Sequence, residues 1–353
     1  MSLLARSKNV FNALAASPAR LPTRIEIPSK NVDEPGKLGA PLSRNQCYFQ
    51  IRVNEMFLAE ERQWFKTFFP MVYVGTEFQY DGEEVAIPFV IGPDTLGPAI
   101  GNGSQDVVFR NTRVAGISPY RGGRLSMTLV LYRVTETNLS ENLLGMVERL
   151  AGALDFATAI SVYTKIAGAL LDGIELLTGD GGTSPVLGHR IELDPDAGDE
   201  INPAYFAFVD MPEEELGKYT LWIVKDRLMH GPSMDQAKPF RDADFVLTSI
   251  ASTPERSDMD MLSFSDTWKR VLKEAAVPSE DGYTSAKSNL VSLAQTMLLS
   301  PDLIEEHAEL LSDDYGLRMQ SAHLRAVKRA NLSDEEDDDM SRTRSASLKM
   351  LDL

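Results

Sequence analysis

Apolar and polar residues alternate along several short stretches of the first 253 residues. The clearest stretch is Arg124–Val134, where apolar side chains occupy both sets of alternate positions, so we expect a central strand with two buried faces. The same alternation, bounded by turn residues, predicts further strands at Cys47–Val53, Met71–Val74, Glu84–Ile91, Val107–Phe109 continuing toward Val114, Arg190–Leu193, Tyr205–Val209, Tyr219–Lys225 and Asp244–Ser249. Short strands without a βαβ rhythm predict an α+β protein with an antiparallel β-sandwich-like core. Within that core, Glu55–Phe69 is predicted to be helical.

A long segment of residues 140–178 follows a helical repeat instead. Ser140 is a suitable N-cap, and the glycines after Thr178 end the helix. Apolar residues recur at three- and four-residue spacing, which predicts a long inserted amphipathic helix or two shorter helices. The residues of this stripe proposed for interaction, by packing on the core or on a partner, are Leu143, Val147, Leu150, Leu154, Ile160 and Tyr163.

The same segment is long enough to raise the question of a membrane. Its core, Leu150–Leu171, has the nominal length of a bilayer span. Asp155 and Lys165 interrupt it, and each charge costs about 2.5 to 3.5 kcal/mol near a membrane centre. This cost argues against a stable span and leaves transient membrane contact as the alternative.

The C-terminal third is predicted to be helical. Ser265 caps a first helix that Pro278 stops, and Tyr283–Leu299, Pro301–Leu311 and Tyr315–Ala330 follow as further helices. An unbroken run of six acids begins at Asp334, so residues 331–353 are expected to form a disordered acidic tail. Ser345 follows two arginines and Ser333 precedes the acids, which makes both serines candidates for regulatory phosphorylation.

Composition changes across the chain suggest four parts. Residues 1–44 contain five prolines and more basic than acidic residues, which predicts an extended basic N-terminal arm able to dock on an acidic partner. The β-rich core is expected over 45–253 with its helical insertion, and the C-terminal helical region over 258–330, followed by the tail.

The overall charge limits the class of partner. The net charge of −17 repels phosphate backbones, so nucleic acid is not the expected ligand. The single cysteine, Cys47, cannot form a disulfide within the chain, and no secretory signal opens the sequence. Both observations favour the cytoplasm.

Candidate chemistry is sparse in the sequence. No serine-hydrolase elbow, zinc-binding spacing or phosphate-binding loop occurs, and Cys47 lies in a predicted strand, where a buried structural thiol is the usual case. The acidic loop with Asp194, Asp196, Asp199 and Glu200 offers several carboxylates of the kind that calcium prefers. It lacks the spacing of an EF-hand, so a solvated loop is the main reading and a calcium site the alternative; no other cofactor is expected.

Three functional hypotheses follow from these patterns. The first is a non-enzymatic interaction or assembly protein that uses a β-rich core and charged terminal arms to bind a protein partner or a second copy of itself. The second is an effector whose segment 140–178 is released onto a membrane after a trigger such as proteolysis. The third is an enzyme with an active site that no motif announces, and the absence of catalytic motifs places it behind the first.

Overall fold

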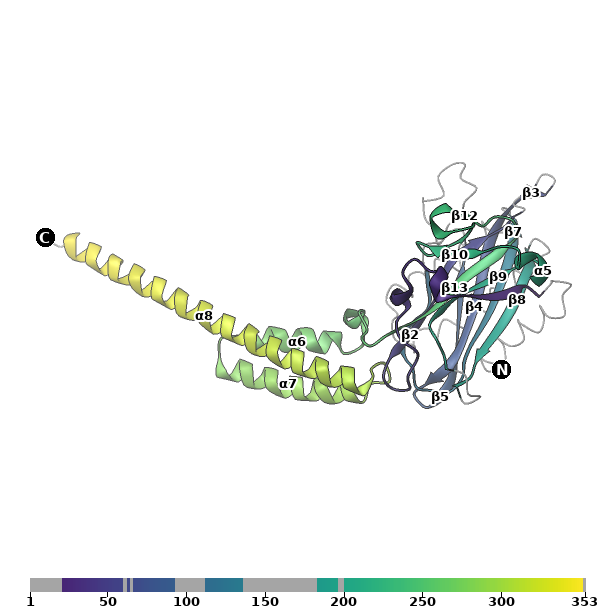
Figure 1. Ribbon diagram of the computed structural model, residues 1–353. Helices are drawn as coiled ribbons and strands as arrows, with labels where there is room; N and C mark the ends of the chain where they lie inside the picture. The colour runs from purple at the N-terminus through teal and green to yellow at the C-terminus, as the bar shows by residue number, and fades with distance from the viewer. Residues whose placement is uncertain are drawn as a thin grey trace. The chain divides into compact units, whose positions relative to one another are not determined.

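The computed structural model describes residues 21–59, 62–63, 66–92, 112–135, 183–195 and 200–351, with the course of the helix alone for 332–351 (Figure 1). The chain divides into two compact units, residues 1–258 and residues 259–353. The first unit is built from antiparallel sheets and the second from helices, so the chain is a mixed α+β protein with a C-terminal helical region, as predicted. The predicted helical insertion, 140–178, lies outside the described residues.

Two large antiparallel sheets form most of the first unit. The strands of the first sheet, in spatial order, are β1 (Thr23–Ile27), β9 (Ala204–Val209), β13 (Phe245–Thr253), β2 (Tyr48–Phe57) and β6 (Thr112–Pro119). Those of the second are β3 (Arg62–Gln63), β4 (Lys66–Tyr80), β7 (Leu125–Thr135) and β8 (Thr183–Leu193), with β5 (Glu83–Ile91) also paired to β4. A small third sheet contains β10 (Leu221–Val224), β11 (Arg227–His230) and β12 (Lys238–Pro239).

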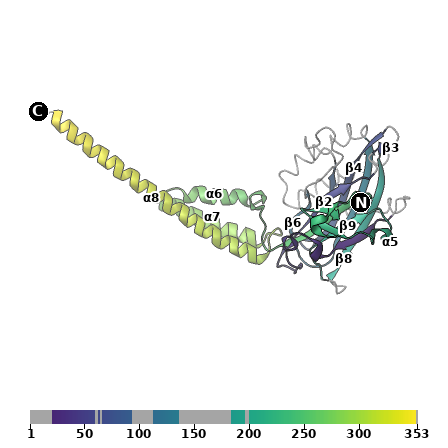
Figure 2. The ribbon, with the colours of Figure 1, turned by 45° about the horizontal axis from the view of Figure 1, so that its top comes forward.

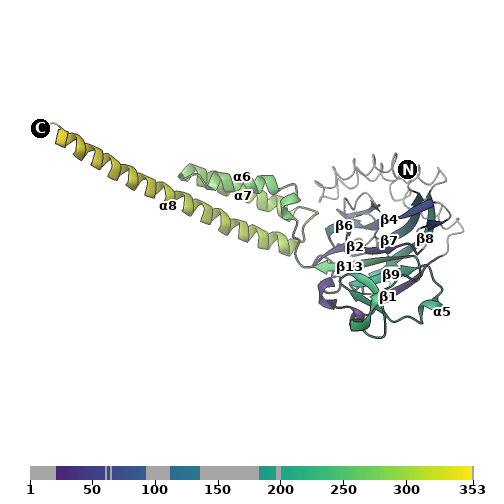
Figure 3. The same cartoon turned by 90° about the horizontal axis from the view of Figure 1, so that it is seen from above.

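The main hydrophobic core lies between the two large sheets (Figure 3). Phe49, Ile51 and Val53 of β2 point into it from the first sheet, and Leu129 and Leu131 of β7 from the second. A separate core on the other face of the first sheet joins β9 and β13 to the third sheet. The first sheet is therefore apolar on both faces, and burial of both faces fixes the register of its strands.

β7 is the central strand that its sequence predicted. It pairs with β4 on one side and β8 on the other, and its alternate residues Val130 and Tyr132 are as fully buried as Leu129 and Leu131. The remaining strand predictions are confirmed wherever residues are described, with bounds that differ by up to seven residues.

The helix predicted for Glu55–Phe69 is wrong. β2 continues through Phe57, which pairs with Phe245 of β13, and β4 already begins at Lys66. The spacing of apolar residues here fits a helix, but pairing with a distant strand overrides local preference.

The arm predicted for residues 1–44 also differs from the structure over its described part. β1 pairs with β9 from Thr23↔Val209 to Ile27↔Tyr205, and Val32, Leu38 and Leu42 are buried. β1 is the edge strand of its sheet, where prolines just outside both ends, Pro22 and Pro28, remove no hydrogen bond inside the sheet. The 3-10 helices η1 (Ser29–Asn31) and η2 (Pro35–Leu38) follow β1 in the chain.

Three helices make up the second unit: α6 (Ser265–Ala275), α7 (Glu280–Leu298) and α8 (Glu305–Leu351). They lie side by side, and α8 continues past the ends of the other two in every view (Figure 2). The rings of Trp268 and Tyr315 stack at 3.9 Å between α6 and α8, while Tyr283 of α7 stacks on His323 at 4.3 Å. The Ser279 side chain caps α7 by accepting from the Gly282 amide. The bounds of α6 and α7 confirm the first two predicted helices.

α8 corrects the remaining helix predictions. The two helices expected at Pro301–Leu311 and Tyr315–Ala330 are one helix, and the tail expected to be disordered over 331–353 is helical through Leu351. No glycine or proline follows Gly316, so the sequence of α8 beyond that point contains no residue that breaks a helix. Arg342 follows Asp338 by four residues, a spacing at which opposite charges support a helix.

The first unit also contains the short helices α5 (Glu213–Leu216) and η6 (Met234–Gln236). The short 3-10 helix η7 (Met259–Met261) lies at the start of the second unit.

Candidate functional site

The acidic loop predicted as a calcium alternative is only partly described. Asp194 is half-buried and Glu200 is exposed, while Asp196 and Asp199 lie outside the described residues. Within the described part of the chain, no three histidine, cysteine, aspartate or glutamate side chains come close enough to hold a metal ion. The calcium site stays a prediction that this structure does not test.

The other predicted positions fall in two places. The stripe Leu143, Val147, Leu150, Leu154, Ile160 and Tyr163 lies outside the described residues. Ser333 and Ser345 lie on α8, within its continuous helix and not in an irregular tail.

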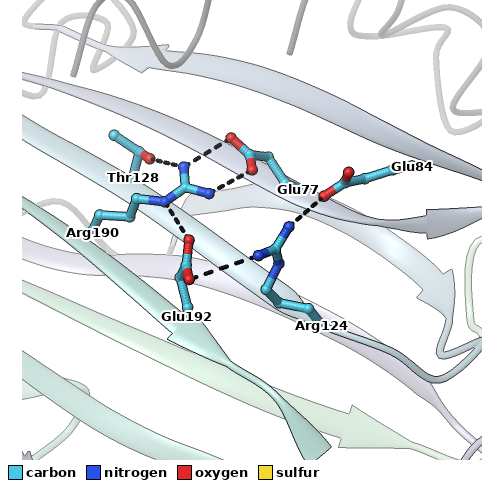
Figure 4. A network of polar contacts seen from close by, with 6 residues as sticks. All are labelled: Glu77, Glu84, Arg124, Thr128, Arg190 and Glu192. Atoms are coloured by element: carbon cyan, nitrogen blue, oxygen red, sulfur yellow. Dashed lines mark hydrogen bonds and ion pairs between the residues drawn. The ribbon is translucent and has the colours of Figure 1, made fainter. Parts of the chain in front are cut away.

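A buried network of charges spans the second sheet (Figure 4). Both oxygens of Glu77 in β4 accept from the guanidinium of Arg190 in β8, at 2.9 and 2.7 Å. The Glu77 side chain is 1% exposed, and that of Arg190 is 14% exposed. Arg190 also donates to Thr128 of β7 at 3.1 Å and to Glu192 at 2.8 Å. These hydrogen bonds, above all those to Glu77, raise the pKa of Arg190 despite its burial.

The network has no free reactive group at its centre. Arg124 extends it at the surface, bridging Glu192 at 3.8 Å and Glu84 at 3.2 Å. Because both oxygens of Glu77 are held by one guanidinium, this carboxylate is already neutralised and oriented. The arrangement holds β4, β7 and β8 together and gives no sign of acid–base chemistry.

A second buried carboxylate, Glu55 of β2, is satisfied in the same way. It is fully buried and accepts from the Leu228 amide and from Arg241, each at 2.8 Å, with Arg227 at 3.4 Å. Arg241 also lies over the ring of Phe57, 4.6 Å from its centroid. Glu55 thus joins the first sheet to the third.

Among the described residues, Cys47 and His230 are candidates for a nucleophile and a general base. Burial raises the pKa of the Cys47 thiol, and its sulfur donates weakly to the Ser43 carbonyl at 3.5 Å, so the unreactive thiol form is favoured. His230 packs against Tyr219 and Phe240, and its Nε2 lies 4.0 Å from Asp242, beyond hydrogen-bond length. Neither site has the geometry of an activated nucleophile or base.

The outer side of α8 carries an unusual row of exposed leucines. Leu310, Leu317 and Leu324 are 56%, 65% and 61% exposed, and they recur every seven residues. Ala308, Tyr315 and Met319 of the same helix are buried against the bundle. The helical repeat of 3.6 residues places the leucines on the opposite side. We call this row the leucine face; its seven-residue spacing is visible in the sequence.

Beyond the bundle, the inner side of α8 is open as well. A groove of about 660 Å³ lies where α6 ends, with Ala322, Ala326, Arg325 and Arg329 of α8 and Pro278 among its lining residues. The described part of α8 therefore offers more than one face to a partner.

Comparisons with known proteins give no guide to function. Neither models of known families, nor curated proteins, nor solved structures include a match to this chain. Among the helices of the described part, none combines the length and the apolar character needed to cross a bilayer.

Proposed function

We propose that this chain is a non-enzymatic interaction or assembly protein in which the β unit is a scaffold and the helical unit is the docking part. The observation that carries the proposal is the leucine face of α8. Large apolar side chains at a heptad spacing on a long helix are typical of helix-to-helix association. Burial of three leucines that are more than half exposed stabilises a complex by roughly 3 kcal/mol in total.

The polar chemistry of the β unit supports a scaffold. Its most deeply buried carboxylates, Glu55 and Glu77, are each bound by arginines that are more than 100 positions away in the sequence. Burial of paired charges of this kind holds strands in place and leaves no ionised group free to act on a substrate. The partner is a protein or a second copy of the chain, since a net charge of −17 disfavours nucleic acid. A single buried cysteine supports action in the cytoplasm.

The test measures association of the full chain by size-exclusion chromatography with light scattering at low and high salt, together with a pull-down. The variant L310Q/L317Q/L324Q removes the leucine face. V291Q/L298Q is the matched control, because both residues are exposed apolar positions of α7. We expect the α8 variant to lose association and the α7 variant to keep it.

Two results would overturn this function. One is a strict monomer at every salt concentration with no retained partner. The other is association that the α8 variant leaves intact to the same degree as the control.

The membrane-effector alternative remains a prediction from sequence, because residues 140–178 lie outside the described part of the chain. Dye leakage from liposomes with intact and nicked protein tests it; no leakage in either form would end it.

A further inference from the structure

The groove at the end of α6 continues a surface on which a helix already packs. Closer to the start of α8, Trp268 of α6 stacks on Tyr315. Ala322 and Ala326 follow Tyr315 by seven and eleven residues, so all three lie on the same side of α8. α6 ends at Ala275, whereas α8 continues (Figure 2). The groove therefore opens where α6 stops covering α8.

Small side chains form the floor of this groove. Ala322, Ala326 and Ala330 recur every four residues along α8, and Ala276 lines the groove from the end of α6. Residues four apart form the rows of a helix surface into which another helix packs. Because alanine side chains are short, a second helix can lie close to α8 here. The floor thus fits the side of a helix.

Two arginines line the same groove. Arg325 and Arg329 are exposed and four residues apart, which is about 6 Å along the helix axis. Like charges at this spacing destabilise a helix on its own. The ion pairs between described residues include that of Arg318 with Asp314 on α8 but none of Arg325 or Arg329. An acidic ligand in the groove would relieve this repulsion.

The surroundings of the groove are basic although the chain is acidic. Residues 315–331 of α8 contain no acidic side chain and four basic ones, Arg318, Arg325, Lys328 and Arg329, in a chain of net charge −17. Among the described residues that line the groove, none is acidic. An acidic partner is repelled by the net charge of the chain and attracted at this groove, so charge selects both the partner and the site.

We propose that the groove binds an acidic helix of a protein partner, which packs on α8 beyond the end of α6. Two carboxylates four residues apart on that helix match the spacing of Arg325 and Arg329, and small side chains beside them contact the alanine floor. A guanidinium holds a carboxylate through two parallel hydrogen bonds. The site goes beyond the proposed function, because the groove and the leucine face lie on different sides of α8.

Peptide binding by the full chain tests the role of charge. The probe is a fluorescein-labelled, alanine-based helical peptide of about 20 residues with a glutamate at every fourth position. A second peptide carries glutamine at the same positions. At low salt we expect the chain to bind the glutamate peptide at least about 10-fold more tightly than the glutamine peptide, and added salt should weaken the binding. Fluorescence anisotropy gives both dissociation constants.

Variants of the groove separate charge from shape. R325A/R329A should weaken binding of the glutamate peptide by about 10-fold or more. A326W fills the floor and should weaken it without a change of charge. K269A/R270A is the matched control, because it removes two exposed positive charges of α6 that do not line the groove, and it should bind like the wild type. R325E/R329E should prefer a peptide with lysines in place of the glutamates, a preference that misfolding cannot produce.

The outcomes keep this site apart from the leucine face. L310Q/L317Q/L324Q should bind the glutamate peptide as tightly as the wild type does. Equal affinity for the glutamate and glutamine peptides, or an affinity that R325A/R329A leaves unchanged, overturns the groove site and leaves the proposed function standing. Peptide binding that only the leucine-face variant loses also overturns it, because the peptide then binds the other side of α8.

Discussion

The Glu77–Arg190 pair gives the most direct quantitative prediction for the β unit. In E77Q, Arg190 loses the negative charge beside it and one of the two acceptors that hold it at 2.7 and 2.9 Å, because the amide NH2 cannot accept, at a site where Arg190 is only 14% exposed. Removing one partner of a buried ion pair typically costs about 3 to 5 kcal/mol, because the remaining charge is left unpaired. Arg190 keeps its contact with Glu192 at 2.8 Å, which lowers the expected loss to about 2 to 3 kcal/mol.

A double-mutant cycle isolates the pair. R190M should cost a similar amount because it leaves Glu77 unpaired, while the double variant should cost far less than the sum, with a coupling energy of roughly 2 kcal/mol. Urea unfolding of the full chain is followed by tryptophan fluorescence in a W268F background. That change removes the tryptophan of α6, so that the signal comes from the unit of residues 1–258.

The outer part of the same network provides the control. Arg124 and Glu84 are 39% and 31% exposed and lie 3.2 Å apart, so R124A should cost less than about 1 kcal/mol. Additive losses in the cycle, or a loss in E77Q no larger than in R124A, would refute the assignment of Glu77 as a buried strand-to-strand anchor.

Three further predictions concern single positions of the β unit, each measured by urea unfolding. Burial, with a smaller effect of Arg24, lowers the pKa of His189 in the folded chain. The unfolded chain therefore binds more protons as the pH drops through the usual histidine pKa of about 6.5, and the free energy of unfolding should fall there. H189L should flatten this part of the plot of stability against pH. The Tyr132 hydroxyl is buried and has no hydrogen-bond partner among the described residues, so Y132F should stabilise the β unit by about 1 kcal/mol; a loss of that size would show that the hydroxyl is satisfied. Gly39 and Gly82 both have positive φ, but a Cβ at Gly39 would collide with the Ser252 carbonyl, whereas one at Gly82 meets open space. G39A should therefore cost at least about 3 kcal/mol of stability and G82A about 1 kcal/mol. Equal losses would contradict the steric argument.

Much of the sheet architecture could be predicted from alternation alone. β7 has two buried faces, and its apolar residues at successive positions indicate a central strand without knowledge of its neighbours. The edge strand β1 was missed although Ile25 and Ile27 alternate with Arg24 and Glu26, because the prolines around it favoured an extended arm. Its partner β9 is almost the whole unit away in sequence, and the alternation alone does not reveal that pairing.

In the candidate site, too, local patterns can be predicted from the sequence and long-range contacts cannot. The leucine face could have been found from the seven-residue spacing of Leu310, Leu317 and Leu324, because periodicity on one helix is local information. The partnership of Glu77 with Arg190 joins residues 113 positions apart and depends on strand register, which only the assembled sheet defines. The sequence alone does not indicate which acidic and basic residues are buried together.

The pairing of Val134 with Thr183 has a consequence for how this chain can be altered. The connection between β7 and β8 leaves and re-enters the sheet at adjacent positions, so its ends are held together by the sheet itself. A change in the length of that connection leaves the alignment of the two strands untouched, and each doubling of a flexible loop costs only about 0.6 kcal/mol. Any segment joined at Thr135 and Thr183 is thus anchored by the sheet at both of its ends, whatever its length.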